Sequence, residues 1–305
     1  MKDLRIIFMG TPEFAIPSLE ILLNYNYQIA GVITALDKPK GRGRKLCPSP
    51  IKKYALDHNI PVLQPKNLKN QDFIEDLRSY RANLQVVVAF RMLPEIVWSM
   101  PEFGTFNLHA SLLPQYRGAA PINWAIIHGE KKTGLTTFFI KQEIDTGNII
   151  LQDEEPISID DDAGSLHDRL MFKGADLVLR TVKVIEKGNV KLRKQMDKPG
   201  LKSAPKITRE MCEIDWNKKC NEIYNFVRGM SPYPAAWLNI KNKNYKVFRV
   251  TIAEESGPLD IGKYKTDNKK YIHFQCADGL IAIDEWQPEG KKRMKIEDFF
   301  RGNTI

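Results

Sequence analysis

The stretch LRIIFMG (Leu4–Gly10) is a continuous apolar run that ends in a glycine. Such runs are typical of strands that are buried on both faces of a parallel sheet. We expect a helix directly after it, with Thr11 as its cap and Pro12 at its first position. The apolar residues that then recur at helical spacing are Ile16, Leu19, Leu22 and Leu23. The chain therefore opens as a strand–turn–helix unit of an α/β protein.

Strands and helices continue to alternate through the first two thirds of the chain. The expected elements are strands at 29–34 and 84–90 and helices at 51–58, 72–79 and 163–187. Strands that alternate with helices at this interval form parallel βαβ units, because each connection crosses back over the sheet. We predict an α/β domain over residues 1–189, with an open, mostly parallel sheet that is covered on both faces.

The last third of the chain has a different pattern. Residues 190–205 are polar, basic and interrupted by proline and glycine, which is a linker composition. Residues 206–305 contain one expected helix at 218–230, followed by short β-rich runs. Two of these runs are joined by Asp278-Gly279, which predicts a two-residue hairpin turn. This pattern favours a second, small domain with an OB-like barrel.

The formal net charge of +9 is unevenly distributed along the chain. Residues 1–189 carry a net charge of +1, so +8 lies beyond them, and the run KPKGRGRK (38–45) alone holds five positive charges. A nearly neutral body with basic patches suggests a large polyanion that contacts both domains. Lysine-rich surfaces also aid solubility, and charge alone does not choose between the two explanations.

The sequence also bears on the cellular location of the protein and on whether it binds a metal. We find no uncharged apolar run of about 18 residues and no secretory signal, so we expect a soluble, cytoplasmic protein without membrane contact. The histidines are dispersed along the chain, and so are the four cysteines, Cys47, Cys212, Cys220 and Cys276. We therefore expect reduced, mostly buried thiols and no metal site.

The turn after the first strand argues against a nicotinamide oxidoreductase. It reads GTPEFA, and the second and third glycines of the dinucleotide fingerprint are missing. The sequence also contains neither a phosphate-binding GxxxxGK[ST] loop nor a GxSxG nucleophile elbow.

The stretch FNLHASLLPQYRGAAP (106–121) carries the most informative polar residues. Asn107 and His109 are two residues apart at the carboxyl end of an expected strand, so both point to one face. Asp145, in EIDTGN, lies at another junction of strand and turn. An amide, an imidazole and a carboxylate are the components for acyl transfer without a covalent enzyme intermediate. Each residue alone also fits a structural role, as a turn former or a core histidine.

The segment FNLHASLLPQYRGAAPINWAIIHGE resembles the signature of the N10-formyltetrahydrofolate-dependent formyltransferases, which have Asn-x-His before Ser-Leu-Leu-Pro and a later Asp. The segments FMGTPEFAIPSL, GRGRKLCPSPIK and MSPYPAAW resemble the members that act on methionyl-tRNA, and the similarity covers nearly the whole chain. The resemblance implies a Rossmann-like catalytic domain followed by an OB-like barrel. It also implies transfer of a formyl group from 10-formyltetrahydrofolate to the α-amino group of methionyl initiator tRNA.

The resemblance assigns roles to individual residues. Asn107 would donate to the oxyanion, and His109 would stabilise that oxyanion or relay a proton. Asp145 would pair with the imidazole or with a water molecule that handles the amine proton. The residues expected to border the folate, through loop backbone and apolar contact, are Ser111, Leu112, Leu113 and Pro114. A purely structural turn is the alternative for that loop.

The basic residues are the expected contacts to tRNA. We assign Arg42 to the acceptor end, because arginine suits phosphate and lies here between two glycines. The accompanying residues are Lys38, Lys40, Arg44 and Lys45 in the same loop, and Lys191, Arg193, Lys194, Lys206 and Arg209 in the linker and barrel. A solvated charge run is the alternative. We expect a monomer, because the second domain already supplies extra binding surface.

One segment departs from the family pattern. Where relatives show AYGxxLP, this chain has AFRMLP (89–94), which is one residue shorter and places Arg91 at the small position. In relatives this segment helps to line the folate pocket. Two other function classes remain as alternatives: a formyltransferase for a small amine, such as a sugar nucleotide, and a non-catalytic RNA-binding protein.

Overall fold

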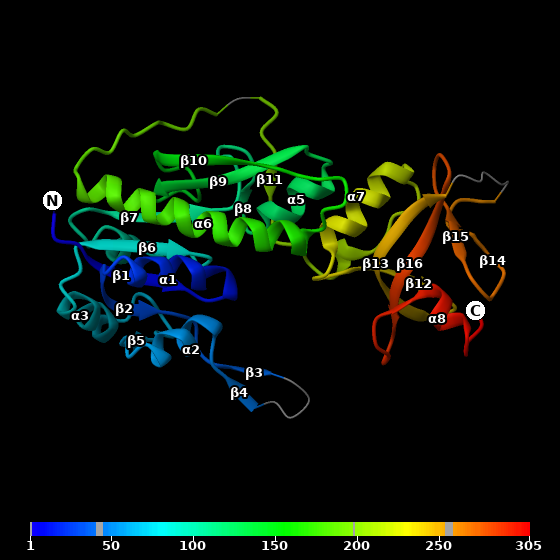
Figure 1. Ribbon diagram of the computed structural model, residues 1–305, viewed down its shortest axis with the longest axis horizontal. Helices are drawn as coiled ribbons and strands as arrows, with labels where there is room; N and C mark the ends of the chain where they lie inside the picture. Colours follow the sequence, from blue (N-terminus) through cyan, green and yellow to red (C-terminus); the bar gives the residue numbers. More distant parts are fainter. Residues whose placement is uncertain (1, 41–44, 198, 254–258) are drawn as a thin grey trace. The chain divides into compact units, whose positions relative to one another are not determined.

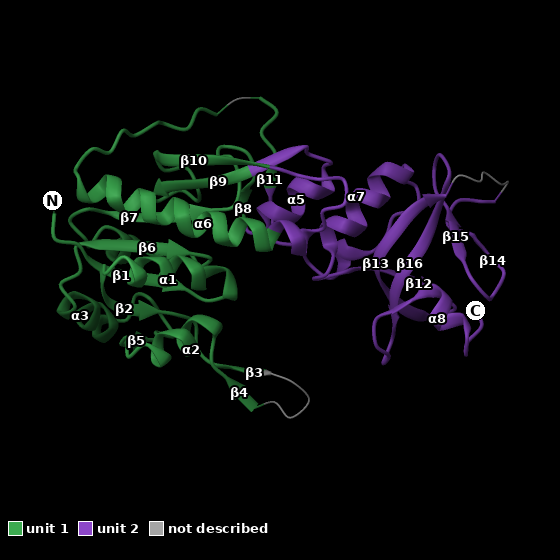
Figure 2. Cartoon of the chain, in the orientation of Figure 1, with its two compact units in different colours: residues 1–118, 134–155, 167–203 green, residues 119–133, 156–166, 204–305 purple. Residues whose placement is uncertain are grey.

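The computed structural model describes residues 2–40, 45–197, 199–253 and 259–305 (Figure 1). The chain forms two compact units, which Figure 2 shows in different colours. Unit 1 comprises residues 1–118, 134–155 and 167–203, and unit 2 comprises residues 119–133, 156–166 and 204–305. Each unit is thus made of three separate segments of the chain. The predicted domain boundaries, with a linker over residues 190–205, stay a prediction. Among the described residues, none of the helices is both long and apolar enough to cross a membrane.

Unit 1 is built on a seven-stranded sheet. In spatial order the strands are β10 (Ile149–Pro156), β9 (Lys132–Phe139), β7 (Thr105–His109), β6 (Leu84–Val88), β1 (Arg5–Gly10), β2 (Gln28–Ile33) and β5 (Val62–Leu63). The five strands from β7 to β5 are parallel, and β9 runs antiparallel to β7. The predicted α/β fold with a mostly parallel sheet is confirmed.

The helices of unit 1 follow the predicted alternation. They are α1 (Ile16–Asn24), α2 (Pro50–Asp57), α3 (Gln71–Ser79), α4 (Glu95–Trp98) and α6 (Ala163–Glu186), which belongs to this unit from residue 167 onward. Side-chain oxygens cap two of them, because Ser49 accepts from the first turn of α2 and Asn70 from that of α3. A short hairpin, β3 (Lys38–Lys40) and β4 (Lys45–Cys47), extends from this unit (Figure 1).

The first helix begins later than predicted. Residues Glu13–Ala15 form a single 3₁₀ turn, and α1 starts at Ile16, so Thr11 is not its cap. Pro17 lies in the first turn of α1, where the missing N–H of proline costs no hydrogen bond. We predicted Pro12 at the first position of the helix, but Pro17 is the proline in its first turn.

Gly10 closes β1 tightly against its neighbours. A Cβ atom at this position would lie 2.7 Å from the Cβ of Ala15 and 3.1 Å from the carbonyl oxygen of Val88. The strand order reverses direction between β1 and β6, and open α/β sheets bind ligands at such a point, outside the carboxyl ends of the strands. The strand ends Gly10, Val88 and His109 therefore mark the edge where a site is expected.

Unit 2 contains a curled, all-antiparallel sheet, which confirms the predicted small barrel-like domain. Its strands are β12 (Ala236–Ile240), β13 (Lys243–Ala253), β16 (Leu280–Pro288), β15 (Ile272–Gln275) and β14 (Tyr264–Thr266), and β17 (Met294–Lys295) pairs with β16. The helices are α5 (Pro121–Ile127), α7 (Cys220–Met230) and α8 (Ile296–Phe300). Its core surrounds Trp286, which is fully buried.

The hairpin between β15 and β16 is present, but its tip is shifted by one residue from the prediction. Cys276 donates its backbone N–H to the carbonyl oxygen of Gly279, so Ala277 and Asp278 form the tip. The Asp278 carboxylate accepts from the backbone N–H of Cys220 at 2.7 Å, at the start of α7. Asp278 thus caps the start of α7. It is the second residue of the turn, whereas the Asp-Gly pattern predicted it as the first.

Asp284 in β16 gives the stability of the protein a predictable pH dependence. Burial raises the pKa of its carboxyl, although a hydrogen bond from Thr251 and the nearby charges of Arg249 and His273 oppose the shift, and Glu285 adds to it. A raised pKa in the folded state means that stability falls as the pH rises through that value. Asp284→Asn is expected to raise the unfolding temperature by about 2–4 °C at neutral pH, with a gain that shrinks toward pH 4.

Thermal unfolding of both proteins across this pH range checks the prediction. Asp267→Asn is the matched control, because backbone N–H groups, led by that of Lys270, lower the pKa of this exposed carboxyl. It should not raise the unfolding temperature. A gain for Asp284→Asn that is equal at pH 4 and pH 7 would contradict the assignment.

Candidate active site

His109 ends β7 in a nearly buried position at the carboxyl edge of the sheet. Its Nε2 atom lies 2.8 Å from the carbonyl oxygen of Tyr116. A carbonyl only accepts, so Nε2 carries a hydrogen and the neutral ring has its lone pair on Nδ1. The Nδ1 atom faces the Asp145 carboxylate, with Oδ2 at 3.8 Å. His109 is therefore arranged to take up a proton at Nδ1, beside a group that stabilises the resulting charge.

Asp145 lies in the turn between β9 and β10, in the left-handed region with φ of 53°. Its Oδ2 atom accepts a hydrogen bond of 2.9 Å from the backbone N–H of Gly118, in the short strand β8 (Arg117–Gly118). Gln195 donates to the backbone carbonyl of the same aspartate at 2.8 Å. The carboxylate is thus held toward His109 by hydrogen bonds on its side chain and on its backbone.

Asn107 lies two residues before His109 on β7, so both side chains project from one face of the strand. It is half-buried, and its carboxamide makes no hydrogen bond to any residue that the structure describes. A preformed amide donor without an internal partner is available to an oxygen of a substrate. The structure thus brings two of the predicted catalytic residues to one face and places the third beside His109.

The loop after β7 is held firmly by side chains of β9 and β10. Thr136 donates to the carbonyl of Ser111 and accepts from the N–H of Leu113, and Gln152 donates to the carbonyl of Leu113. The side chains of Ser111 and Leu113 are buried, whereas Leu112 and Pro114 are half-exposed. Direct side-chain contact with a ligand is therefore restricted to Leu112 and Pro114, together with the loop backbone.

The segment AFRMLP (89–94), which differs from the family pattern, follows β6 at the same edge of the sheet. Ala89 has φ of 50°, and the Arg91 guanidinium donates to the backbone carbonyls of Pro65 and Lys66. Arg91 thus joins this loop to the segment after β5. Met92 beside it is 74% exposed. Arg91, which stands where the family pattern has a small residue, is therefore held by hydrogen bonds within this chain.

The predicted tRNA-binding residues lie on separate segments. Arg42 and Arg44 fall outside the described residues. The other three residues of the basic loop lie on the β3–β4 hairpin, with Lys40 opposite Lys45 in the register and Lys38 exposed in β3. Lys206 and Arg209 are exposed in unit 2.

Three residues around His109 were missed by the sequence analysis. They are Tyr116, Gly118 and Gln195, which hold the imidazole and Asp145 through the hydrogen bonds described above. Two of them act through backbone atoms, which leave no signal in residue type. Gln195 lies in the segment that composition identified as a linker, and its neighbour Arg193 exchanges two backbone hydrogen bonds with Ile149.

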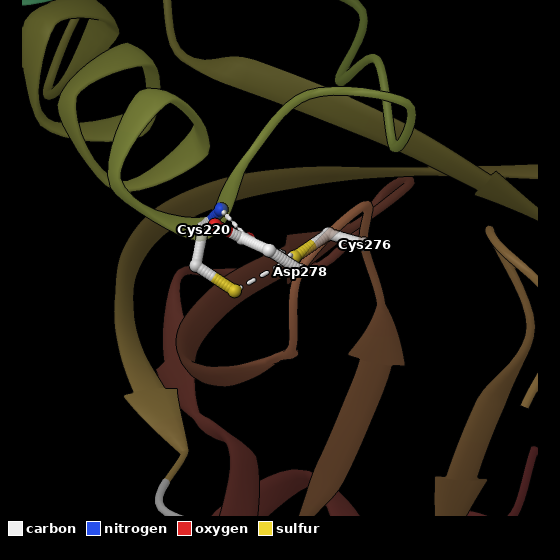
Figure 3. Close-up of side chains that lie close together, drawn as sticks. All are labelled: Cys220, Cys276 and Asp278. Carbon is white, nitrogen blue, oxygen red and sulfur yellow. Dashed lines mark hydrogen bonds between the residues drawn. The ribbon is translucent and has the colours of Figure 1, made fainter. Parts of the chain in front are cut away.

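A second group that the sequence did not predict lies in unit 2. Cys220, Cys276 and Asp278 meet between the start of α7 and the β15–β16 turn (Figure 3). The two sulfur atoms are 2.7 Å apart, whereas two thiolates on one zinc ion would be separated by about 3.8 Å. Burial raises the pKa of the Cys220 thiol, and the neighbouring Cys276 adds to the shift. The group is a pair of free, buried cysteines beside the start of a helix, and we assign no metal to it.

Comparison with known proteins places the chain in a family. Residues 4–182 match the formyl transferase family and residues 206–304 match the formyl transferase C-terminal domain. Methionyl-tRNA formyltransferase of Flavobacterium johnsoniae is 52% identical over 100% of this chain and 98% of its own length. The enzyme of that name from Bacteroides fragilis is 51% identical over 99% of this chain and 95% of its own length.

A solved structure shares the fold. The sugar 3N-formyltransferase WlaRD is 24% identical, has a TM-score of 0.67, and is matched over 96% of this chain and 100% of its own. At this identity the likeness concerns the fold alone. Because relatives match at about half identity over nearly their full length, the chain belongs to the methionyl-tRNA formyltransferase group of the formyl transferase family.

Proposed function

We propose that this chain transfers the formyl group of 10-formyltetrahydrofolate to the α-amino group of methionyl initiator tRNA, which yields N-formylmethionyl-tRNA. The observation that carries the proposal is the site itself. An amide that bonds to none of the described residues, an imidazole with its lone pair on Nδ1 and a fixed carboxylate lie there at the carboxyl edge of the sheet. Full-length similarity to relatives of that name supports the choice of acceptor.

The reaction needs charge stabilisation and one proton acceptor. The neutral amine attacks the formyl carbon, and a tetrahedral intermediate with an oxyanion forms. Asn107 donates a hydrogen bond to this oxyanion, and the pre-placed donor requires no reorganisation. His109 accepts the amine proton at Nδ1, and the Asp145 carboxylate stabilises the imidazolium. The same proton can then pass to N10 of the folate as the carbon–nitrogen bond breaks and tetrahydrofolate leaves.

The folate is expected along the loop after β7. Backbone groups of Ser111 and Leu113 and the half-exposed side chains of Leu112 and Pro114 are the groups that the loop offers. Their position next to Asn107 and His109 in the chain supports a binding mode in which the N10 end of the folate lies near these two residues. Solved relatives of the same fold include one determined with 5-N-formyltetrahydrofolate and one with tetrahydrofolate, which supports a folate donor.

The transfer is tested directly with purified components. The chain is mixed with 10-formyltetrahydrofolate and methionyl initiator tRNA, and N-formylmethionine is measured after hydrolysis of the aminoacyl ester. We expect one tetrahydrofolate for each formyl group transferred. Absence of product with intact, charged tRNA would contradict the proposed function.

The basic residues of unit 2 are expected to act through the phosphate backbone of the tRNA. Lys206→Ala combined with Arg209→Ala removes two exposed cations. We expect a higher KM for tRNA, a salt dependence with a slope lower by about 1.5–2, and unchanged kcat and folate KM. The assay is a salt series of initial rates at limiting tRNA.

Lys69→Ala combined with Lys187→Ala is the matched control, because it removes two exposed cations from unit 1 outside the proposed tRNA contacts. This control should retain the salt slope of the parent chain. Equal slopes for the parent chain and the Lys206/Arg209 variant would remove these two residues from tRNA binding.

A further inference from the structure

Gln195 is nearly buried although the chain around it is polar and exposed. Its relative exposure is 8%, whereas Met196 beside it is 64% exposed. It lies in the segment between α6 and β11 (Ser203–Ala204), which composition identifies as a linker. A buried amide in such a segment requires partners for all of its polar atoms.

The partners of Gln195 use its full hydrogen-bonding capacity. The Nε2 group donates to the carbonyl oxygens of Asp145 and Gly147, each at 2.8 Å. The Oε1 atom accepts from Nε of Arg117 at 3.1 Å and from Nη2 of Arg117 at 2.8 Å. A carboxamide has two N–H donors and two acceptor positions, and all four are occupied here.

These contacts connect the two segments that hold the catalytic histidine and aspartate. Arg117 lies between Tyr116, whose carbonyl accepts from His109, and Gly118, whose N–H donates to the Asp145 carboxylate. On the other side, Gln195 holds the backbone of Asp145 itself. The amide therefore closes a ring of hydrogen bonds that runs from the β8 segment through Asp145 and back.

The geometry of the ring explains why such a support is needed. Tyr116 has φ of 59° and Asp145 has φ of 53°, and non-glycine residues seldom adopt this conformation unless their surroundings hold them there. Position 147 accepts only glycine, because a Cβ atom there would lie 1.6 Å from the carbonyl oxygen of Phe139. A tight turn with a left-handed residue at the catalytic position depends on its external hydrogen bonds.

The segment that carries Gln195 is itself fixed on both sides. Arg193 and Ile149 exchange backbone hydrogen bonds of 2.8 and 2.9 Å, and Lys202 accepts one of 2.7 Å from Tyr116. The glutamine thus reaches the site from an anchored backbone. We propose that Gln195 is a positioning residue of the active site, which sets the placement of Asp145 relative to His109 without contacting either substrate. This inference rests on the proposed formyl transfer.

Two substitutions separate the functions of the amide. Gln195→Ala removes all four hydrogen bonds. Gln195→Glu keeps the size and the acceptors for Arg117 but removes both donors and places a negative charge against two carbonyl oxygens. We expect each to lower kcat by about 10- to 100-fold, the effect of a misplacement of about 1 Å, while the KM for folate and the KM for tRNA change less than about threefold. Met196→Ala, at the exposed neighbouring side chain, is the control and should behave as the parent chain.

A double-mutant cycle tests whether Gln195 acts through Asp145. If it does, Gln195→Ala should add little to the loss caused by Asp145→Ala, so that the double variant has a kcat within about threefold of the single Asp145 variant. A residue that affects catalysis independently of Asp145 would give losses that multiply. Thermal unfolding of each variant confirms that the rates are measured on folded protein, and Gln195→Glu serves where Gln195→Ala does not fold.

Three results would overturn the inference: a kcat for folded Gln195→Glu within twofold of the parent chain, losses that multiply in the cycle, or normal turnover by Asp145→Ala. The parent chain is measured in the same assay. A parent chain without transferase activity would instead overturn the proposed function, so the two failures are distinguishable.

Discussion

Asn107→Ala is expected to lower kcat by about 100- to 1,000-fold, because the oxyanion loses a preorganised donor. The carboxamide of Asn107 makes no hydrogen bond to any described residue and is half-buried. Its removal therefore leaves no internal partner unsatisfied. Single-turnover rates with saturating folate and charged tRNA measure the effect on the chemical step.

Asn107→Ala should leave the stability of the protein and its binding of folate nearly unchanged. The unfolding temperature should stay within about 1–2 °C of the parent value, because surface and half-exposed truncations away from special features cost little stability. Binding of the folate should also persist, since the donor acts mainly when charge develops on the formyl oxygen. Turnover within threefold of the parent chain would remove Asn107 from its role.

His109→Ala is expected to lower kcat by about 100- to 10,000-fold, because the amine loses its proton acceptor. The structure favours Nδ1 as the accepting atom, since Nε2 is committed to the carbonyl of Tyr116 and Nδ1 faces Asp145. Initial rates over a pH series measure the loss. Imidazole added to the assay should restore part of the activity of this variant and none of the activity of Asn107→Ala.

This substitution also affects the fold, and the effect must be separated from catalysis. His109 is nearly buried, and its truncation removes the hydrogen bond to the Tyr116 carbonyl. We expect a cost of about 1–3 kcal/mol in the free energy of unfolding. Rates are therefore taken well below the unfolding temperature of the variant. Full activity of the folded variant would exclude His109 as the proton acceptor.

Local pattern was sufficient to predict the fold and the shared strand face of Asn107 and His109. Ile6–Met9 is apolar throughout because β1 lies inside a sheet that is covered on both faces. The spacing of Asn107 and His109 placed them on one face, since side chains of a strand alternate with a period of two. Where two similar signals competed, residue type did not decide between them, and Pro17 instead of Pro12 lies in the first turn of the first helix.

Long-range hydrogen bonds could not be read from the sequence. Gln195 is 78 residues from Arg117 and 50 residues from Asp145, and its surroundings in the chain are typical of a solvated linker. The contacts of Tyr116 and Gly118 use backbone atoms, which every residue type offers. Likewise, the pairing of Cys220 with Cys276 joins positions that are 56 residues apart. Such contacts depend on the register of the whole sheet.

Burial within the loop after β7, at residues 111–114, was a further feature that residue type did not reveal. Ser111 and Leu113 turn inward, and Thr136 and Gln152 hold the loop that carries them. Buried and half-exposed positions thus alternate in the motif. Substitutions at Ser111 and at Leu112 are therefore expected to act for different reasons, the first through packing and the second through contact with the ligand.

The choice of acceptor is the central claim, and the ratio of kcat/KM values tests it most directly. The chain is supplied with 10-formyltetrahydrofolate and, in parallel reactions, with methionyl initiator tRNA, free methionine and a sugar-nucleotide amine. We predict formylation of the charged tRNA with a kcat/KM that exceeds those for both small amines by at least about 1,000-fold, since only the tRNA engages the basic surfaces. A kcat/KM for the sugar-nucleotide amine equal to or above that for the tRNA would contradict the account.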